Sequence, residues 1–270
     1  MLTVTFIRHG QSEDNVKNIW AGWKDAPLSE LGVKASDRII KRRGQAFLKS
    51  NTKFDFIYAS DLLRAHATGQ AVLNSHSLPK PPFTSDNRLR EQHFGIAEGR
   101  PWVIATPPNM TYEDMFAQGI FPVLRGREAK FPEGESLNDL ARRTESAIAD
   151  CVVLHLAAAV QSDVHIAIAS HGLCISELVA ALLRLDPESR RDISYAGLLN
   201  TAWTRAVVSI KDASLAGPFD VDHLPPLTVK ITDVNNSDHL DSLEAGIEDA
   251  GVLDDDKAAA RAFFAGKAAA

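Results

Sequence analysis

Cysteine is scarce in this sequence, and long hydrophobic runs are missing. Only two of the 270 residues are cysteines, Cys151 and Cys174, and each lies inside an apolar stretch. So few thiols argue against a disulfide framework and favour a reducing compartment. No apolar run approaches the roughly 20 residues of a membrane span, and no charged-then-apolar leader precedes the first apolar segment. We therefore expect a soluble, cytoplasmic protein that binds no membrane.

Metal-ligand patterns are also missing. The sequence has no His-Glu-x-x-His, no closely spaced cysteine pair and no aspartate cluster at the end of an expected strand. Zinc and magnesium sites are commonly built from such groups. We therefore expect a protein that works without a metal ion and without a cofactor.

A broad excess of basic residues is the third absence. The net charge is −6, but residues 212–270 hold twelve acidic and four basic residues, so residues 1–211 carry +2. Because the net charge of residues 1–211 is close to zero, they offer no wide basic surface for nucleic acid, although a local cationic pocket is still compatible with it. The acidity is concentrated toward the end of the chain, where we expect residues 236–270 to form a weakly ordered or helical tail.

Strand-like and helix-like patterns alternate along the rest of the chain. Runs rich in β-branched and aromatic residues predict strands over 2–7, 54–59, 165–170, 202–210 and, at a sheet edge, 227–232. Helical periodicity predicts helices after Gly32 to about Leu48, over 62–73, near 112–117, after Ser136 to about Ala159, and over 173–185. The pattern is typical of an α/β protein, with one catalytic domain expected over residues 1–235.

Two histidines directly follow predicted strands. His9, preceded by Arg8, follows the first strand, and His171 follows the third. Arg64 lies in the first turn of the helix that follows the second strand. Ligands of open α/β sheets bind at the carboxyl ends of the strands, where these side chains are expected to meet. Two guanidinium groups and two imidazoles around one point suit a phosphoryl dianion.

One carboxylate and one irregular segment complete the candidate site. Glu91 lies in a charged cluster between two apolar residues, and Glu13 and Glu98 are its alternatives. Residues 100–134 are interrupted by prolines, which favours a lid or a wall of the substrate site. Three cations of this segment are either simply exposed or contact a second anionic group of a substrate: Arg125, Arg127 and Lys130.

Four motifs in order carry a family resemblance: Arg8-His9-Gly10, Ser60-Asp61-Leu62-Leu63-Arg64-Ala65, Leu89-Arg90-Glu91 and Ser170-His171-Gly172. Together they resemble the histidine phosphatase superfamily, and more narrowly its branch of cofactor-dependent phosphoglycerate mutases and fructose-2,6-bisphosphatases. The resemblance covers roughly residues 1–210. It implies a three-layer α/β/α sandwich with a mostly parallel central sheet, like that of phosphoglycerate mutase.

The resemblance also implies a role for each motif. His9 is the expected nucleophile, which attacks phosphorus and forms a phosphohistidine. Glu91 is expected to protonate the departing alkoxide and then to deprotonate the attacking water. The residues expected to bind the substrate are Arg8, Asn15, Gly22, Arg64, His171 and Gly172.

The same resemblance leaves the substrate and the reaction type open. Residues 20–29 are similar to the substrate loop of the mutases, but the segment after Gly99 lacks their basic insertion. Residues 95–99 and 132–136 look like those of phosphatase members. We expect a phosphomonoester hydrolase for a small phosphorylated metabolite of the sugar phosphate or phosphoglycerate type, with fructose 2,6-bisphosphate as one candidate. The alternatives are a phosphoglycerate mutase-type phosphotransferase and a catalytically weak binding module, and the oligomeric state is left open.

Overall fold

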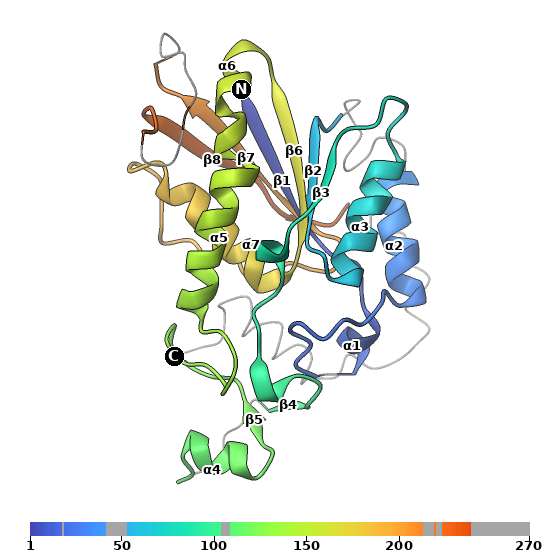
Figure 1. Cartoon of the computed structure of the whole chain (residues 1–270), viewed down its shortest axis with the longest axis vertical. Helices are drawn as coiled ribbons and strands as arrows, with labels where there is room; N and C mark the ends of the chain where they lie inside the picture. Colours follow the sequence, from blue (N-terminus) through green and yellow to red (C-terminus); the bar gives the residue numbers. More distant parts are fainter. Residues whose placement is uncertain (18, 42–52, 104–108, 213–218, 220–222, 239–270) are drawn as a thin grey trace.

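A six-stranded sheet forms the centre of the molecule (Figure 1). The computed structural model describes residues 1–17, 19–41, 53–103, 109–212, 219 and 223–238. The strands are β1 (Leu2–Arg8), β2 (Phe56–Ala59), β3 (Phe83–Ser85), β6 (Val164–Ser170), β7 (Trp203–Ile210) and β8 (Leu227–Asn236). Their order is β3-β2-β6-β1-β7-β8; the first four are parallel, and β7 and β8 each run antiparallel to the preceding strand. The predicted mostly parallel α/β sheet is confirmed.

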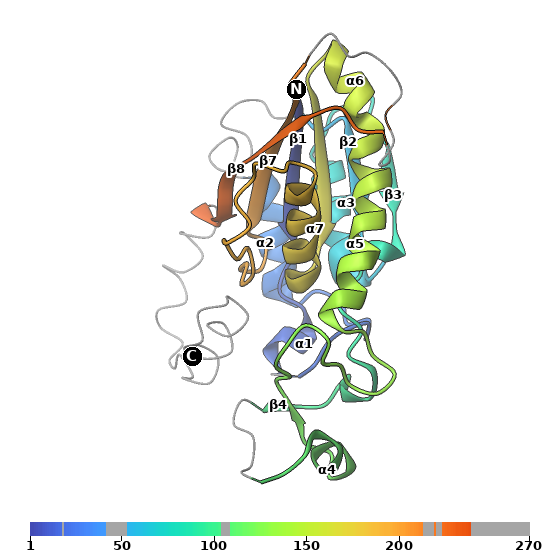
Figure 2. The same ribbon diagram turned by 90° about the vertical axis from the view of Figure 1, so that its left-hand side faces the viewer.

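Helices cover both faces of the sheet (Figures 1 and 2). They are α2 (Glu30–Lys41), α3 (Leu63–Asn74), α5 (Leu137–Cys151), α6 (Leu156–Gln161) and α7 (Gly172–Arg184). Alternate residues of β1 face opposite layers, as strand geometry requires. Val4 and Phe6 pack in a cluster with residues of α5 and α7, whereas Ile7 packs in a second cluster with Val72 of α3. Both faces of the central strands are therefore buried.

Smaller elements lie beyond the carboxyl ends of the parallel strands (Figure 1). They are α1 (Glu13–Val16), the short helix α4 (Tyr112–Ala117), the 3₁₀ turns η1 (Asn87–Leu89) and η2 (Gly95–Ala97), and the strand pair β4 (Trp102–Val103) and β5 (Phe121–Pro122). The helix predicted near 112–117 is confirmed. Residues 109–134 contribute Phe121 and Phe131 to an aromatic cluster that also includes Trp20 and Phe94. No described helix has both the length and the apolarity needed to cross a bilayer.

Several element boundaries differ from the sequence predictions. The single helix predicted to reach about Ala159 is broken, because Val152 leaves helical geometry and is followed by η3 (Val153–His155) and α6. Strand β3 is not among the predicted strands, and β8 extends to Asn236. The predicted end of the second helix near Leu48 and most of the acidic tail lie outside the described residues.

Candidate active site

The parallel pairing of β1 with β6 brings the two motif histidines together. Arg8 lies opposite Ser170 in the register, and the His9 N–H donates to the Ser170 carbonyl at 2.9 Å. The ring centroids of His9 and His171 are 5.0 Å apart, with the rings inclined by 58°. Both side chains are buried, with exposed fractions of 3% and 0%. Residues separated by more than 160 positions therefore share one small, desolvated volume.

His9 is held as a neutral imidazole with one nitrogen available. Its Nδ1 lies 2.6 Å from the carbonyl oxygen of Gly10, so Nδ1 carries the proton and donates it. Burial, followed by the positive charges of Arg64 and Arg8, holds the pKa of His9 well below its ordinary value. The lone pair therefore resides on Nε2, as an attacking nucleophile requires.

Arg64 is buried and aimed by two backbone carbonyls. Its Nη2 donates to Gly22 at 2.7 Å and its Nη1 donates to Lys24 at 2.9 Å. Its Nε is buried without a hydrogen-bond partner among the described residues. A buried guanidinium with an unused donor is a ready site for an anionic oxygen.

Gly22 supports this arrangement through its backbone. Its φ of +49° lies in the left-handed region, and a Cβ there would lie 2.1 Å from Glu98 Oε1. Glu98 in turn accepts hydrogen bonds from the backbone N–H groups of Trp23 and Phe94. The structure thus gives Gly22 a defined contact with Arg64, whereas direct contact with a substrate stays a prediction.

His171 presents an unused nitrogen to the same volume. Its Nε2 lies 2.9 Å from Ser60 Oγ, which also accepts a hydrogen bond from the Leu62 N–H. In the tautomer with the proton on Nδ1, His171 Nε2 accepts the hydroxyl proton of Ser60. That Nδ1 is buried without a partner among the described residues, so it is a second unused donor. Ser60 was not among the predicted site residues.

Arg8 and Gly172 lie close to each other and to Glu91. Arg8 Nη1 donates to the Leu198 carbonyl, which fixes the direction of the guanidinium. A Cβ built on Gly172, the first residue of α7, would lie 3.7 Å from Arg8 Nε and 3.9 Å from Glu91 Oε2. Arg8, Gly172 and Glu91 are thus near neighbours, as the motif order predicts.

The Glu91 carboxyl group lies at the N-terminus of α7. Its Oε1 accepts hydrogen bonds from the N–H groups of Gln92 at 3.0 Å and Cys174 at 3.1 Å. Its Oε2 accepts a longer hydrogen bond of 3.3 Å from the Leu173 N–H. Oε2 is therefore the oxygen better placed to exchange a proton, while Oε1 anchors the group.

The alternative carboxylates are placed less well. Glu13 is exposed at the start of α1. Glu98 is occupied by the two backbone N–H groups described above and lies 3.7 Å from His93 Nε2. Among the three carboxylates considered from the sequence, Glu91 alone adjoins Arg8 and Gly172.

Asn15 lies in α1 and is held by a capping turn. Its Oδ1 accepts from the Ser12 N–H and from Asn200 Nδ2, so only its own Nδ2 can donate to a substrate. Asn200 was not predicted as a site residue, yet its Nδ2 also lies 3.2 Å from the His9 carbonyl. A short amide chain therefore connects Asn15 to the backbone of the nucleophile.

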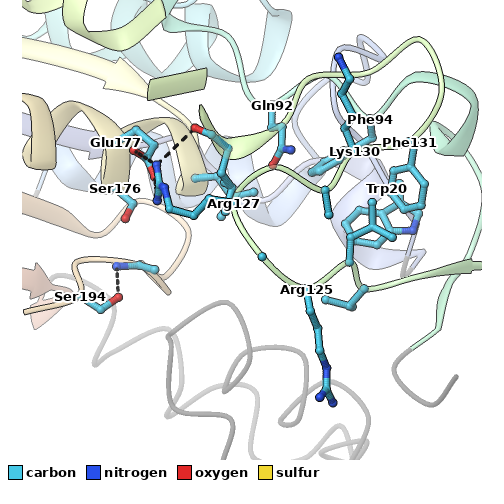
Figure 3. A pocket seen from close by; sticks show the side chains of 17 residues that line it. Trp20, Gln92, Phe94, Arg125, Arg127, Lys130, Phe131, Ser176, Glu177 and Ser194 are labelled. Atoms are coloured by element: carbon cyan, nitrogen blue, oxygen red, sulfur yellow. Dashed lines mark hydrogen bonds and ion pairs between the residues drawn. The ribbon is translucent and has the colours of Figure 1, made fainter. Parts of the chain in front are cut away.

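A pocket of about 420 Å³ borders the Glu91 segment, although Glu91 and the two motif histidines do not line it (Figure 3 shows its lining). It is lined by residues that include Gln92 and Leu173, the neighbours of the Glu91 carboxyl group, and by the segment 123–131. Two of the three cations predicted as candidates for a second anion are already in ion pairs. Arg127 donates to both oxygens of Glu177 at 2.9 and 2.8 Å, and Lys130 lies 3.7 Å from Asp139.

Metal-ligating side chains are not grouped in the described part of the chain. Within it, no cluster of three or more His, Cys, Asp or Glu side chains could hold a metal ion. The site is therefore built from cationic and neutral hydrogen-bond donors around His9, with one carboxyl group.

Solved structures of several hydrolases have the same fold. The mycobacterial glucosyl-3-phosphoglycerate phosphatase Rv2419c is 24% identical, with a TM-score of 0.59, and the alignment covers 87% of this chain and 99% of that one. A protein described as an alpha-ribazole-5'-P phosphatase from Escherichia coli K-12 is 19% identical, with a TM-score of 0.56 and coverage of 87% and 97%. At these identities the likeness concerns the fold.

Sequence comparison extends the likeness to a family. A probable phosphoglycerate mutase, GpmB, from Yersinia pestis is 29% identical over 191 residues, which cover 71% of this chain and 79% of that protein. The family model of the histidine phosphatase superfamily, branch 1, matches residues 4–216. That span includes all four motifs and all strands of the sheet except β8 and the first residues of β1. The chain belongs to the histidine phosphatase superfamily, branch 1.

Proposed function

We propose that this protein hydrolyses phosphomonoesters of a small metabolite through a phosphohistidine on His9. The observation that carries the proposal is the unprotonated Nε2 of His9, set among donors of Arg64 and His171 that have no partner among the described residues. Such donors stabilise the charge on the equatorial oxygens of a transferring phosphoryl group. Because the ring centroids of His9 and His171 are 5.0 Å apart, a phosphoryl group bound to His9 can also contact His171.

Two displacements at phosphorus complete the reaction. In the first, His9 Nε2 forms a bond to phosphorus as the ester P–O bond breaks, and the Glu91 carboxyl proton passes to the departing alkoxide. In the second, the Glu91 carboxylate takes a proton from water, whose oxygen attacks phosphorus. The P–N bond then breaks, phosphate leaves, and both His9 and Glu91 return to their starting protonation states.

Net hydrolysis is preferred to phosphoryl transfer between two positions of a phosphoglycerate. A mutase of that kind has to bind a carboxylate or second phosphate beside the reacting group, which calls for available cations. Arg127 and Lys130 are engaged with Glu177 and Asp139 instead, and the third candidate, Arg125, points away from the aromatic side chains of the pocket (Figure 3). The mutase remains the second candidate because of the 29% identity to a probable phosphoglycerate mutase.

A panel of esters separates the candidates. Wild-type protein is expected to release phosphate from at least one of a set of sugar phosphates, phosphoglycerates, fructose 2,6-bisphosphate and an aryl phosphate, without added metal. Isomerisation of a phosphoglycerate in the presence of a bisphosphorylated primer, without phosphate release, would identify a mutase. Protein that binds these esters but converts none of them would be a binding module.

A further inference from the structure

The pocket borders the Glu91 segment through two of its lining residues. Gln92, the neighbour of Glu91, lines it, as does Leu173, whose N–H donates to Glu91 Oε2 at 3.3 Å. The bridging oxygen of the substrate has to reach Glu91 to be protonated. A carbon skeleton that leaves this oxygen on the Leu173 side enters the pocket.

The walls of the pocket are mainly aromatic and aliphatic. Trp20 packs against Phe94 and Phe131 with ring centroids 4.6 and 5.3 Å apart, and all three line the pocket (Figure 3). Leu124 and Leu137 add aliphatic surface. Ligand pockets of this size and lining gain affinity chiefly by removing apolar ligand surface from water.

Most polar side chains of the lining already have partners. Gln92 Nε2 donates to the Glu135 carbonyl, and Arg127 is paired with Glu177, as Figure 3 shows. Arg125 is exposed and points away from the aromatic side chains in the same view. A highly hydroxylated or anionic alcohol would lose its bonds to water here without gaining equivalent ones.

We infer that the substrate is a phosphomonoester whose alcohol carries an apolar or aromatic group that fills this pocket. The inference rests on the proposed function and narrows its substrate class. It disfavours short polar alcohols, including the phosphoglycerates in the panel above.

Three primary-alcohol esters test the inference because they place similar demands on Glu91. They are glycerol 1-phosphate, n-propyl phosphate and 2-phenylethyl phosphate. We expect kcat/KM for phosphate release to be roughly 10-fold or more higher for the phenylethyl ester than for the propyl ester, because each buried apolar group contributes to binding. The Leu124→Asn variant should reduce that ratio. Leu154→Asn, an exposed leucine of η3 away from the pocket, is the matched control and should keep it.

The outcomes distinguish this inference from the proposed function. Phosphate release at equal rates from the three esters, or fastest from glycerol 1-phosphate, overturns the apolar pocket while hydrolysis stands. No release from any ester, the aryl phosphate included, overturns the hydrolase itself. A ratio that Leu124→Asn and Leu154→Asn lower equally would place the selectivity outside this pocket.

A second, independent observation concerns the side chain that holds the Glu91 segment. Arg143 of α5 uses all five of its N–H donors. Its Nε and Nη2 bind the Glu135 carboxylate at 2.9 and 2.7 Å. The other three donors bind the carbonyls of Arg88, Arg90 and Glu91 at 2.7, 2.9 and 3.0 Å. One guanidinium thus fixes three carbonyls of the segment that ends at Glu91.

The geometry points to Arg143 as a positioning residue for Glu91. The indole of Trp23 supports the same carbonyl, since its Nε1 donates to Glu91 at 2.7 Å. A planar guanidinium spans several acceptors at fixed angles, which an ammonium cannot do. The neighbouring Arg142 differs: it is exposed and pairs with Asp139 within its own helix. This second inference also rests on the proposed role of Glu91.

Leaving-group dependence tests the positioning role. In Arg143→Ala we expect phosphoryl transfer from propyl phosphate to slow by roughly 100-fold, because displacement of a catalytic group by about 1 Å has that effect. The initial burst of p-nitrophenol from p-nitrophenyl phosphate should slow only a few-fold, because that leaving group needs no proton. KM should change little, and Arg142→Ala should behave as wild type.

Equal slowing of both esters in a cooperatively unfolding Arg143→Ala protein would overturn the positioning role. If Arg143→Ala does not fold, Arg143→Lys decides in its place: selective loss with propyl phosphate supports the inference, and uniform loss or no loss contradicts it. Glu91→Gln is run in parallel. A Glu91→Gln protein without leaving-group dependence would instead contradict the acid role of Glu91.

Discussion

Replacing His9 with alanine is expected to reduce phosphate release by at least about 10⁴-fold, because residues that act as one catalytic unit lose most of their effect together. The variant lacks the one protein atom that we propose bonds to phosphorus. Arg64 and His171 would remain to bind the phosphoryl group, but without a nucleophile they cannot form the covalent intermediate of the two-step reaction. The measurement is the steady-state rate of phosphate release from the best ester of the panel.

His66→Ala is a matched control for this prediction. His66 lies on α3 two residues after Arg64 and packs edge-on against Phe83, with ring centroids 5.2 Å apart. Its loss should leave phosphate release within a few-fold of wild type. A folded His9→Ala protein that retained a tenth of the wild-type rate would show that another group makes the bond to phosphorus.

Replacing Glu91 with glutamine is expected to have the second largest effect. General acid–base catalysis contributes roughly 10² to 10⁴-fold, so hydrolysis of an alkyl phosphate should fall within that range. Glutamine keeps one carbonyl oxygen for the Gln92 and Cys174 N–H groups, which limits disturbance of the start of α7. The direct consequence of the change is therefore the loss of the transferable proton.

The pre-steady-state kinetics of Glu91→Gln test the acid and base roles of Glu91 more specifically than the steady-state rate does. With p-nitrophenyl phosphate, p-nitrophenol should appear in a rapid burst of one equivalent per active site, because its departure needs no acid. Slow turnover should follow, because the attacking water has lost its base. A burst that is absent while wild type shows one, or steady turnover at the wild-type rate, would remove Glu91 from the mechanism.

The sequence contains enough information to predict which strand ends form the site. His9 and His171 follow apolar runs of strand length, and parallel strands in an α/β sheet bring such ends to one edge. Arg64 could be added because helix α3 begins directly after β2. These inferences need only local pattern and the general rules of sheet topology.

Contacts between distant side chains were not predictable in the same way. No sequence pattern indicates three of the contacts in the structure. They are the hydrogen bond between Ser60 and His171, the hydrogen bonds of Arg143 to the Glu91 segment, and the ion pair of Arg127 with Glu177. Strand β3 was missed because its three residues follow a proline-rich stretch, and β-pairing with β2 overrides that local signal. Tertiary context decides each of these features.

Isolation of the phosphorylated intermediate tests the central claim most directly. Glu91→Gln protein mixed with p-nitrophenyl phosphate, quenched in alkali and digested should yield one phosphorylated peptide, with the phosphoryl group on His9. Alkaline conditions are needed because phosphohistidine hydrolyses in acid. Phosphorylation of His171 or of any other residue, or the absence of a phosphorylated peptide from protein that shows the burst, would contradict the proposed reaction.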